Sequence, residues 1–383
     1  MSAAKWRRAM NTGLAGALPP RLPGAGGQAA IAVPARGPSQ YPDSAAPRWL
    51  KFFWRTVSFR HVVTLAFVLL LPWVVSPFVI YQVASQALIF GLIALSLTFL
   101  AGYGGMVSLA QMSVAGMAGY AVAVLGASGT ATSLGWPWGV VVPVALVIAV
   151  LCSTLIGWLS VRTDGIYTIM ITLAIGVAFY YLVLQNYTVF NGFQGFQKVY
   201  PPQVFGLNWR DPLPFYFLCL FWALAGYGFI QWLVRTPFGI VLQGTRDNAR
   251  RMNSLGYNVI AHRVAAYAVS GLLAGVGGVL LVWYNGLITP GSVGTGWLIN
   301  VLVIAVLGGM KHPIGAFLGA IVFILLQTFA IDVIDRERFN LVIGGVFLAI
   351  VLFSPDGLLG LWAKLRMRLR PSQVLTSTTR RQP

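Results

Sequence analysis

The side chains that could carry out catalysis are few and scattered in this sequence. His61, His262 and His312 are far apart, and Cys152 and Cys219 each lie inside an apolar run. Metal sites and nucleophilic sites require several such groups close together. The few Asp and Glu residues form no group with them. The sequence therefore predicts no metal, no cofactor and no catalytic residue, which disfavours an intramembrane enzyme.

The sequence also lacks the phosphate-binding loop of ATPases. That motif, G-x-x-x-x-G-K-[ST], places a glycine directly before a lysine. No lysine of this chain follows a glycine. If the function of this protein uses ATP, hydrolysis has to take place in another subunit.

A few uncharged polar residues lie within apolar stretches, where they could contact a polar solute. A polar side chain in an apolar helix can also hydrogen-bond to a neighbouring helix, which contributes about 0.6 kcal/mol on average. Both interpretations stay open, and Gln111 is the first candidate for contact with a solute. The candidate path residues are Ser108, Gln111, Thr172, Asn285 and Asn300.

One polar segment, residues 235–263, carries several helix signals. Thr236 before Pro237 predicts a helix start, since proline is favoured at the first helical position. A second start is expected at Thr245, and Gly256 is a natural helix end. A basic face lies opposite a narrow apolar stripe formed by Ala249, Met252 and Leu255. Such a helix could bind a partner protein or rest on anionic lipid.

The elements that position these residues have to be membrane helices. Of the 383 residues, 57% are hydrophobic and 9% are charged. The mean hydropathy is +0.77. A soluble domain carries about 25% charged residues, and a helix needs about 20 apolar residues to cross the bilayer. The apolar runs are long and continuous, unlike the alternating strands of a β-barrel. We expect an all-α bundle of about ten transmembrane helices.

The expected domain map has three parts. Residues 1–60 form a basic tail without periodicity, which we expect to be disordered. Residues 61–361 form the transmembrane domain, and residues 362–383 form a second basic tail. The glycine-rich stretch 102–105 could break a span. The expected spans are 61–83, 85–101, 105–127, 136–160, 164–186, 213–233, 264–284, 294–309, 313–331 and 339–361.

The positive charges orient this map. Cytoplasmic loops of membrane proteins carry an excess of Lys and Arg. The chain has 26 of them, and all but four lie in the two tails, in the segment 235–263 or at ends on the same side. The other side holds Lys198, Arg210, Arg336 and Arg338. We therefore expect both termini in the cytoplasm. The same distribution explains the net charge of +18 without nucleic-acid binding.

Four stretches together resemble one family. They read LAGYGGMVSLAQMSVAGMAGYAVAVL, VRTDGIYTIMITLA, TPFGIVLQGTRDNARRMNSLGYNV and LGGMKHPIGAFLGA. They are similar to conserved segments of the LivM-type permease subunit of branched-chain amino-acid ABC importers. The resemblance covers roughly residues 62–361. The chain departs from the family at Ala110 and Gln111, where Gly and His are usual, and at Lys311-His312, where Gly-Ser is usual.

The resemblance implies a bacterial inner-membrane permease subunit that is not itself an enzyme. Its partners would be two ATP-binding subunits, a homologous LivH-like permease and a periplasmic substrate-binding protein. The segment 235–263 would be the coupling loop on an ATP-binding subunit. The residues that match the family pattern there are Arg246, Asp247, Asn248, Leu255 and Gly256.

Two alternatives stay open. Urea and amide importers use permeases of the same build, so the substrate is not fixed by the resemblance. An ion-coupled secondary transporter usually needs ionisable groups in the middle of the membrane. None of the expected spans has one at its centre.

Overall fold

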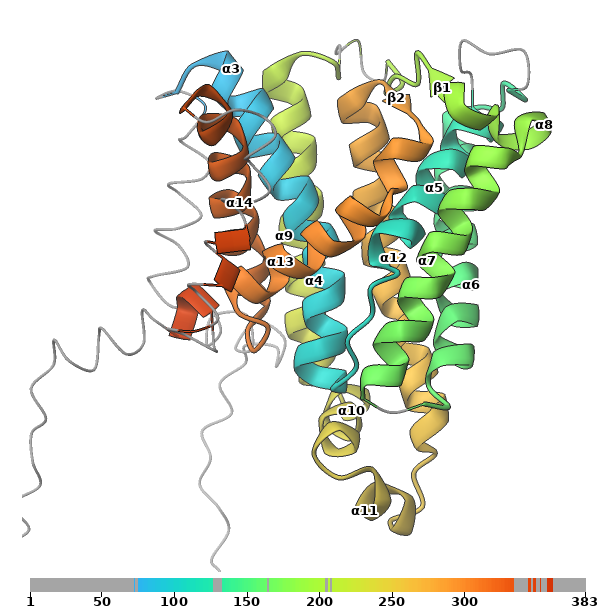
Figure 1. Ribbon diagram of the computed structural model, residues 1–383, viewed down its shortest axis with the longest axis vertical. Helices are drawn as coiled ribbons and strands as arrows, with labels where there is room; N and C mark the ends of the chain where they lie inside the picture. Colours follow the sequence, from blue (N-terminus) through green and yellow to red (C-terminus); the bar gives the residue numbers. More distant parts are fainter. Residues whose placement is uncertain are drawn as a thin grey trace, which may run out of the picture. The chain divides into compact units, whose positions relative to one another are not determined.

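The structure is a computed structural model (Figure 1), and it describes most of the chain between residues 75 and 333. The segments 127–132, 164, 204–205 and 207–208 within that range are not described. Beyond it, only residue 72 and short pieces between 344 and 360 are described. The two expected tails and most of the expected span 339–361 therefore lie outside the described residues.

The first described helix is longer than the sequence indicates. Ser76 and Pro77 start it, as expected for proline at the first helical position. Its parts are α3 (Pro77–Val79), the π-helical turn η1 (Ile80–Ser85) and α4 (Gln86–Gly104). Together they form one apolar helix of 28 residues. The expected boundary between two spans near residue 84 is wrong. The chain passes through a π-helical turn there, which is wider than an α-helical turn but does not end the helix.

Four further helices are long and apolar enough to cross a membrane. They are α6 (Trp138–Ser160), α7 (Ile166–Gln185), α9 (Pro212–Val234) and α12 (Val259–Asn285). Continuous apolar runs predict all four within a few residues. The described part of the chain is thus a helical membrane bundle, with five such helices or up to six if a bent pair counts as one.

The remaining apolar helices are short or broken. The glycine-rich stretch ends α4, and an extended segment leads to α5 (Gln111–Leu125). The predicted break is confirmed. Similarly, α13 (Thr295–Gly308) and α14 (Pro313–Val333) bend by 115° at the residues between them. Irregular backbone at membrane depth has to be covered by protein or face water, so these breaks are candidates for function.

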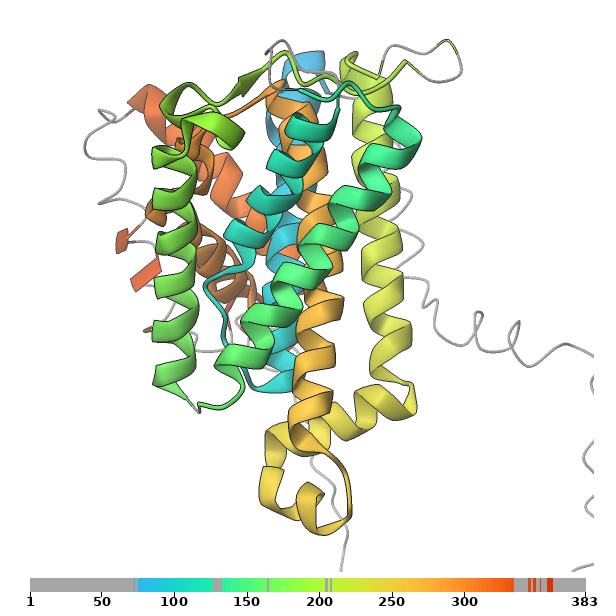
Figure 2. The same ribbon diagram turned by 90° about the vertical axis from the view of Figure 1, so that its right-hand side faces the viewer.

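Helix α12 lies at the centre of the packing, between α4, α5 and α6 (Figures 1 and 2). Small residues allow the close approach. A side-chain carbon added at Gly278 of α12 would collide with the carbonyl oxygen of Ala115 on α5. Helix α14 also packs along α4. Few residues of α6 and α7 are fully buried, and the exposed apolar side chains of both helices contribute to an outer surface.

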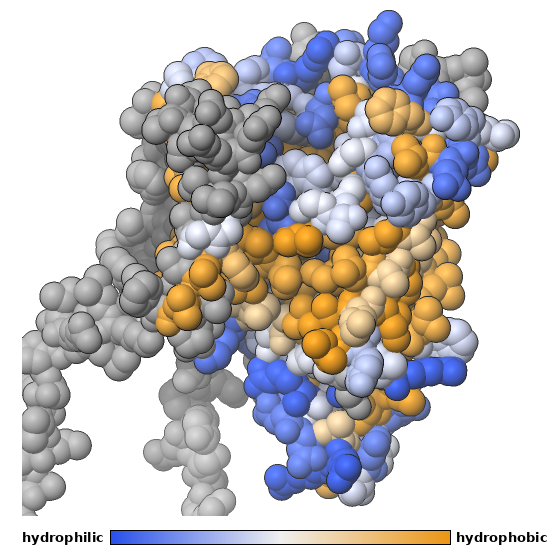
Figure 3. Space-filling view, in the orientation of Figure 1, coloured by the Kyte–Doolittle hydropathy of each residue, from blue (hydrophilic) through white to orange (hydrophobic). Residues whose placement is uncertain are grey.

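The two ends of the bundle differ (Figure 1). At one end the loops form a two-residue antiparallel ladder, in which Phe196 of β1 (Phe196–Gln197) pairs with Ile288 of β2 (Leu287–Ile288). The short elements α8 (Tyr187–Phe190), η2 (Gly192–Gln194) and η3 (Pro290–Val293) surround it. At the other end lie α10 (Pro237–Asp247) and α11 (Ala249–Ser254). An apolar band separates the two polar ends (Figure 3).

Candidate functional site

The candidate site is the pair of short helices α10 and α11, which project from one end of the bundle (Figures 1 and 2). This end is hydrophilic in Figure 3, in contrast to the apolar band next to it. The positive-inside distribution of charge predicts that this end faces the cytoplasm. The segment therefore lies where a cytoplasmic protein could reach it.

Helix α10 starts where the sequence predicts. The hydroxyl of Thr236 accepts a hydrogen bond from the backbone N–H of Gly239 at 3.5 Å. Gly239 lies against the backbone of Leu233 and Val234, where a Cβ would collide. The turn between α9 and α10 is therefore tight, and it fixes the direction of α10. Gln243 secures the turn by donating to the carbonyl of Val234 at 3.3 Å.

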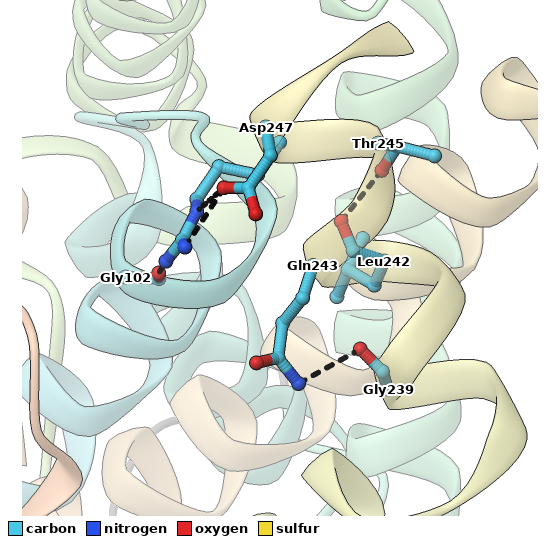
Figure 4. A network of polar contacts seen from close by, with 7 residues as sticks. Gly102, Gly239, Leu242, Gln243, Thr245 and Asp247 are labelled. Carbon is cyan, nitrogen blue, oxygen red and sulfur yellow. Dashed lines mark hydrogen bonds and ion pairs between the residues drawn. The ribbon is translucent and has the colours of Figure 1, made fainter. Parts of the chain in front are cut away.

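One face of α10 is anchored in the bundle. Val241 and Leu242 are buried, and Leu242 is fully covered. Thr245 is buried as well, and its hydroxyl donates to the carbonyl of Leu242 at 2.6 Å (Figure 4). Pro237 and Ile240 are exposed on the side away from the bundle, and Arg246 and Asp247 are exposed at the C-terminal end of α10. The helix thus has one side fixed to the membrane domain and one side free for a partner.

The predicted second helix start at Thr245 is wrong. Asn248 starts α11 instead, and its side chain accepts a hydrogen bond from the backbone N–H of Arg251 at 2.9 Å. A threonine hydroxyl that is buried and bonded within α10 cannot cap another helix, whereas the extended backbone of Asn248 presents its side chain to the next turn. The helix end at Gly256 is confirmed, with φ +88°, a value that favours glycine.

The five predicted coupling residues are all exposed. Arg246, Asp247 and Asn248 lie at the junction of α10 and α11, and Leu255 and Gly256 follow α11. Leu255 is 64% exposed, although it is a large apolar residue. The segment thus presents one large apolar side chain together with charged groups.

Arg246 links this segment to the membrane domain. Its guanidinium donates to the carbonyl oxygen of Gly102 in the last turn of α4, and it forms an ion pair with Asp247 at 2.9 Å (Figure 4). In a continuous helix, the backbone N–H of Met106 would donate to the carbonyl oxygen of Gly102. Here it donates to the carbonyl oxygen of Leu100 instead. Arg246 therefore satisfies a carbonyl that the end of α4 leaves open.

Three of the candidate path residues gather where α5 begins. Ser108, Gln111 and Thr172 are all buried. The hydroxyl of Thr172 on α7 accepts a hydrogen bond from the backbone N–H of Leu109 at 3.1 Å. The hydroxyl of Ser108 accepts one from the N–H of Ala110 at 3.4 Å. The first bond holds the irregular segment before α5 against α7, and the second lies within the segment.

Gln111 joins three helices. Its side-chain oxygen lies 3.0 Å from the hydroxyls of Ser96 on α4 and Ser270 on α12. Its side-chain nitrogen is buried without a hydrogen-bond partner. A buried donor without a partner costs about 1–3 kcal/mol. Gln111 is thus held by its oxygen, and its buried nitrogen has no hydrogen-bond partner among the described residues.

The other two candidate path residues lie apart from this group. Asn285 is exposed at the end of α12, beside a small cavity that also contacts Gly116 and Val293. Asn300 is half-buried on α13. The structure therefore brings together only three of the five residues.

Sequence reasoning missed the partners of these residues. Ser96 and Ser270 are serines within apolar helices, 174 positions apart. Gly102 contributes only a carbonyl oxygen, which any residue has. The glycine-rich break marks the region but not its contacts. Among the described residues, no group of three His, Cys, Asp or Glu side chains could hold a metal ion.

Comparisons with known proteins identify the family. Residues 79–351 match the family described as branched-chain amino acid transport system / permease component. The chain is 23% identical to the high-affinity branched-chain amino acid transport system permease protein LivM of Salmonella typhimurium, over 76% of this chain and 72% of that protein. It is 24% identical to LivM of Escherichia coli K12, over 73% of this chain and 69% of that protein.

A relative with another printed substrate also matches. The autoinducer 2 import system permease protein LsrC of Escherichia coli O157:H7 is 31% identical over 37% of this chain and 42% of that protein. No solved structure matches the chain. The family match covers most of the chain and includes the break before α5, α10 and α11, and the α13–α14 bend. This multi-pass membrane protein therefore belongs to the family of branched-chain amino acid transport system permease components, the LivM-type permeases of ABC importers.

Proposed function

We propose that this chain is a non-catalytic permease subunit that carries amino acids, chiefly branched-chain ones, across the bacterial inner membrane. A periplasmic binding protein delivers the substrate. Two ATP-binding subunits drive transport, and a LivH-like permease completes the membrane domain. The full chain has about ten spans, with both termini in the cytoplasm.

One observation carries this proposal. Helices α10 and α11 are capped, anchored and exposed at the end of the bundle that the charges assign to the cytoplasm. The chain has no phosphate-binding loop of its own. A projecting segment of this kind in a family of ABC permeases supports docking on a separate ATP-binding subunit. Exposed Leu255 provides apolar contact area, and Arg250 and Arg251 provide charge.

The branched-chain substrate is supported by the two LivM relatives. Among the described residues, the candidate path groups are uncharged, and the side-chain amide of Gln111 is the first of them. Uncharged groups hold a zwitterion weakly, and weak binding allows passage. In this arrangement most of the selection takes place in the binding protein. A urea or amide importer of the same build is the second candidate.

The test is ATP-driven uptake by the purified complex. The chain is co-expressed with its partner permease, ATP-binding subunits and binding protein, and reconstituted in vesicles. We expect uptake of labelled leucine, isoleucine or valine that requires both ATP and the binding protein. Uptake of urea or acetamide in their place would establish the second candidate. Uptake that follows an ion gradient without ATP would contradict the proposal.

A further inference from the structure

The end of α4 lies between the α10–α11 segment and the α13–α14 turn, and we propose that it transmits movement from one to the other. Arg246 would be the positioning residue on one side and Met310 the contact on the other. The inference rests on the proposed function, because it describes how docking of an ATP-binding subunit reaches the membrane domain.

The contact on the α10 side is close and directional. The guanidinium of Arg246 donates to the carbonyl oxygen of Gly102. The stem of the same side chain packs on Gly105, where a Cβ would lie 2.6 Å from Arg246 Cγ. Gly105 has φ +68°, which ends α4 and favours glycine. Arg246 thus contacts two points of the α4 end, and α10 cannot shift without displacing it.

The contact on the opposite side leaves no free space. A Cβ added at Gly102 would collide with the carbonyl oxygen of Met310 and would lie 3.9 Å from the Cα of Lys311. Met310 and Lys311 form the turn between α13 and α14. Backbone therefore touches backbone at Gly102. Displacing the α4 end toward the turn has to displace the turn too, because packed groups do not compress.

The α13–α14 turn can pass this movement into the membrane. The two helices meet at 115°, and Gly309 has φ +106° between them. Gly308 contacts the backbone of Gly315 and Gly319, so the two helices move together near the turn. Helix α13 also contacts α5 and α7, which carry Gln111 and Thr172. The route therefore ends at the buried polar group described above.

Asp247 orients the guanidinium of Arg246. Its carboxylate accepts from Arg246 Nε at 2.9 Å and pairs with the terminal nitrogen at 2.9 Å. Asp247 holds one edge of the guanidinium, and another guanidinium nitrogen donates to the carbonyl oxygen of Gly102. A lysine could supply the charge and a donor but could not hold both contacts in this geometry.

The experiment measures whether nucleotide binding moves the α13–α14 turn through Arg246. Cys152 and Cys219 are replaced by alanine, and Lys311→Cys provides a reporter on the exposed turn. The reconstituted complex is labelled with a water-soluble maleimide, and the permease band is quantified after electrophoresis. Labelling rates are compared between the nucleotide-free complex and the complex trapped with ATP and vanadate.

We expect the labelling rate at position 311 to differ between the two states when Arg246 is present. Arg246→Gln should abolish this difference in complexes that retain their ATP-binding subunits, and co-purification and ATP hydrolysis are measured on the same sample. Couplings between sites typically correspond to about 5–150-fold effects, so we expect substrate transported per ATP to fall about tenfold. Arg246→Lys should restore part of the difference.

Gly102→Ala tests the second contact without changing charge. It should also reduce substrate transported per ATP, because the added methyl group separates α4 from Met310. Gly228→Ala is the matched control, since no atom lies within 4 Å of a Cβ at that position in α9. If the complex that carries Gly102→Ala fails to assemble, the results for Arg246→Gln and Arg246→Lys decide whether the inference holds.

Three results would overturn the inference. The labelling rate could be the same in both nucleotide states, which would show that the turn does not move. The difference could persist in Arg246→Gln, which would exclude Arg246 from the route. Arg246→Gln could lose its ATP-binding subunits, which would make Arg246 a docking residue only. Failure of the unmodified complex to bind ATP-binding subunits would instead contradict the proposed function.

Discussion

The side-chain oxygen of Gln111 lies 3.0 Å from the hydroxyl of Ser270, although 159 positions separate the two residues. The same oxygen lies 3.0 Å from the hydroxyl of Ser96. Each hydroxyl has one proton to donate, and each also lies within hydrogen-bonding distance of a backbone carbonyl as an alternative acceptor: that of Ile93 for Ser96 and that of Ser96 for Ser270. Neither hydroxyl would therefore lose its only partner if Gln111 were replaced. This arrangement separates the structural role of Gln111 from a role in transport.

Gln111→Leu should reduce uptake while the complex still assembles. Leucine has similar bulk, and the serines retain their backbone acceptors, so we expect a small loss of stability, about 0.6 kcal/mol per lost bond. Loss of the unpartnered amide nitrogen removes the group that could contact a solute. The measurement is the uptake rate normalised to purified complex.

Thr98→Val is the control for this change. It also removes a buried polar group, but the hydroxyl of Thr98 has no hydrogen-bond partner. Its uptake per complex should stay unchanged. An unaltered rate in Gln111→Leu as well would remove Gln111 from the path and leave it as a contact between helices.

Gly278→Ala should destabilise the bundle. The added methyl group would collide with the carbonyl of Ala115, so α12 and α5 would have to separate. Overpacking of this kind typically costs about 1–3 kcal/mol or more. We expect a lower thermal midpoint and a lower yield of monodisperse complex in detergent. Gly228→Ala, which meets open space, should behave like the unmodified protein; equal midpoints for the two variants would contradict the α5–α12 crossing.

The α10–α11 segment should be required for coupling of ATP hydrolysis to uptake. Arg246→Glu reverses the charge of the contact with Gly102, and Gly256→Pro replaces a residue with φ +88° by one that cannot adopt it. The double variant should insert into the membrane but lose uptake driven by ATP. Membrane insertion is measured by fractionation, and uptake by labelled substrate. Normal uptake in this variant would show that the segment is not the coupling element.

Reporter fusions test the orientation of the chain. Fusions after residues 200 and 335 should report the periplasm, and fusions after residues 250 and 370 should report the cytoplasm. Residues 200 and 250 lie beside opposite ends of the described bundle, as β1 and α11 show in Figure 1. Positions 335 and 370 are outside the described residues. A cytoplasmic signal at 335 would place Asp335 and Glu337 on the inner side and would contradict the ten-span map.

The long helices could be predicted from sequence because hydropathy alone determines them. The expected spans 136–160, 164–186 and 213–233 agree with α6, α7 and α9 within two residues at each end. The continuity of the first helix through residue 84 was not predicted, because a π-helical turn leaves no clear signal in an apolar run. A helix end needs a residue that cannot continue the helix, and no glycine or proline lies between Pro77 and Gly91.

The candidate site was only partly predictable for a different reason. Local signals located the caps at Thr236 and Gly256, since each depends on the chemistry of a few neighbouring residues. The contacts of Arg246 and Gln111 depend on which helices meet, and a single sequence does not contain that information. Thr245 shows the limit within the segment itself. Its hydroxyl suits a cap, but burial in α10 gives it another acceptor.

The contact between α4 and α12 has a consequence for biosynthesis. Ser96 and Ser270 are 174 positions apart, so at about 5–20 residues per second the ribosome needs roughly 10–35 s to make the second after the first. During that interval α4 has no α12 to cover it. Ser96 keeps the carbonyl of Ile93 in its own helix as an acceptor during that interval, whereas the amide of Gln111 has only Ser96, water or the insertion machinery as partners. The half-made chain therefore carries a polar amide that gains its contact with Ser270 only when α12 arrives.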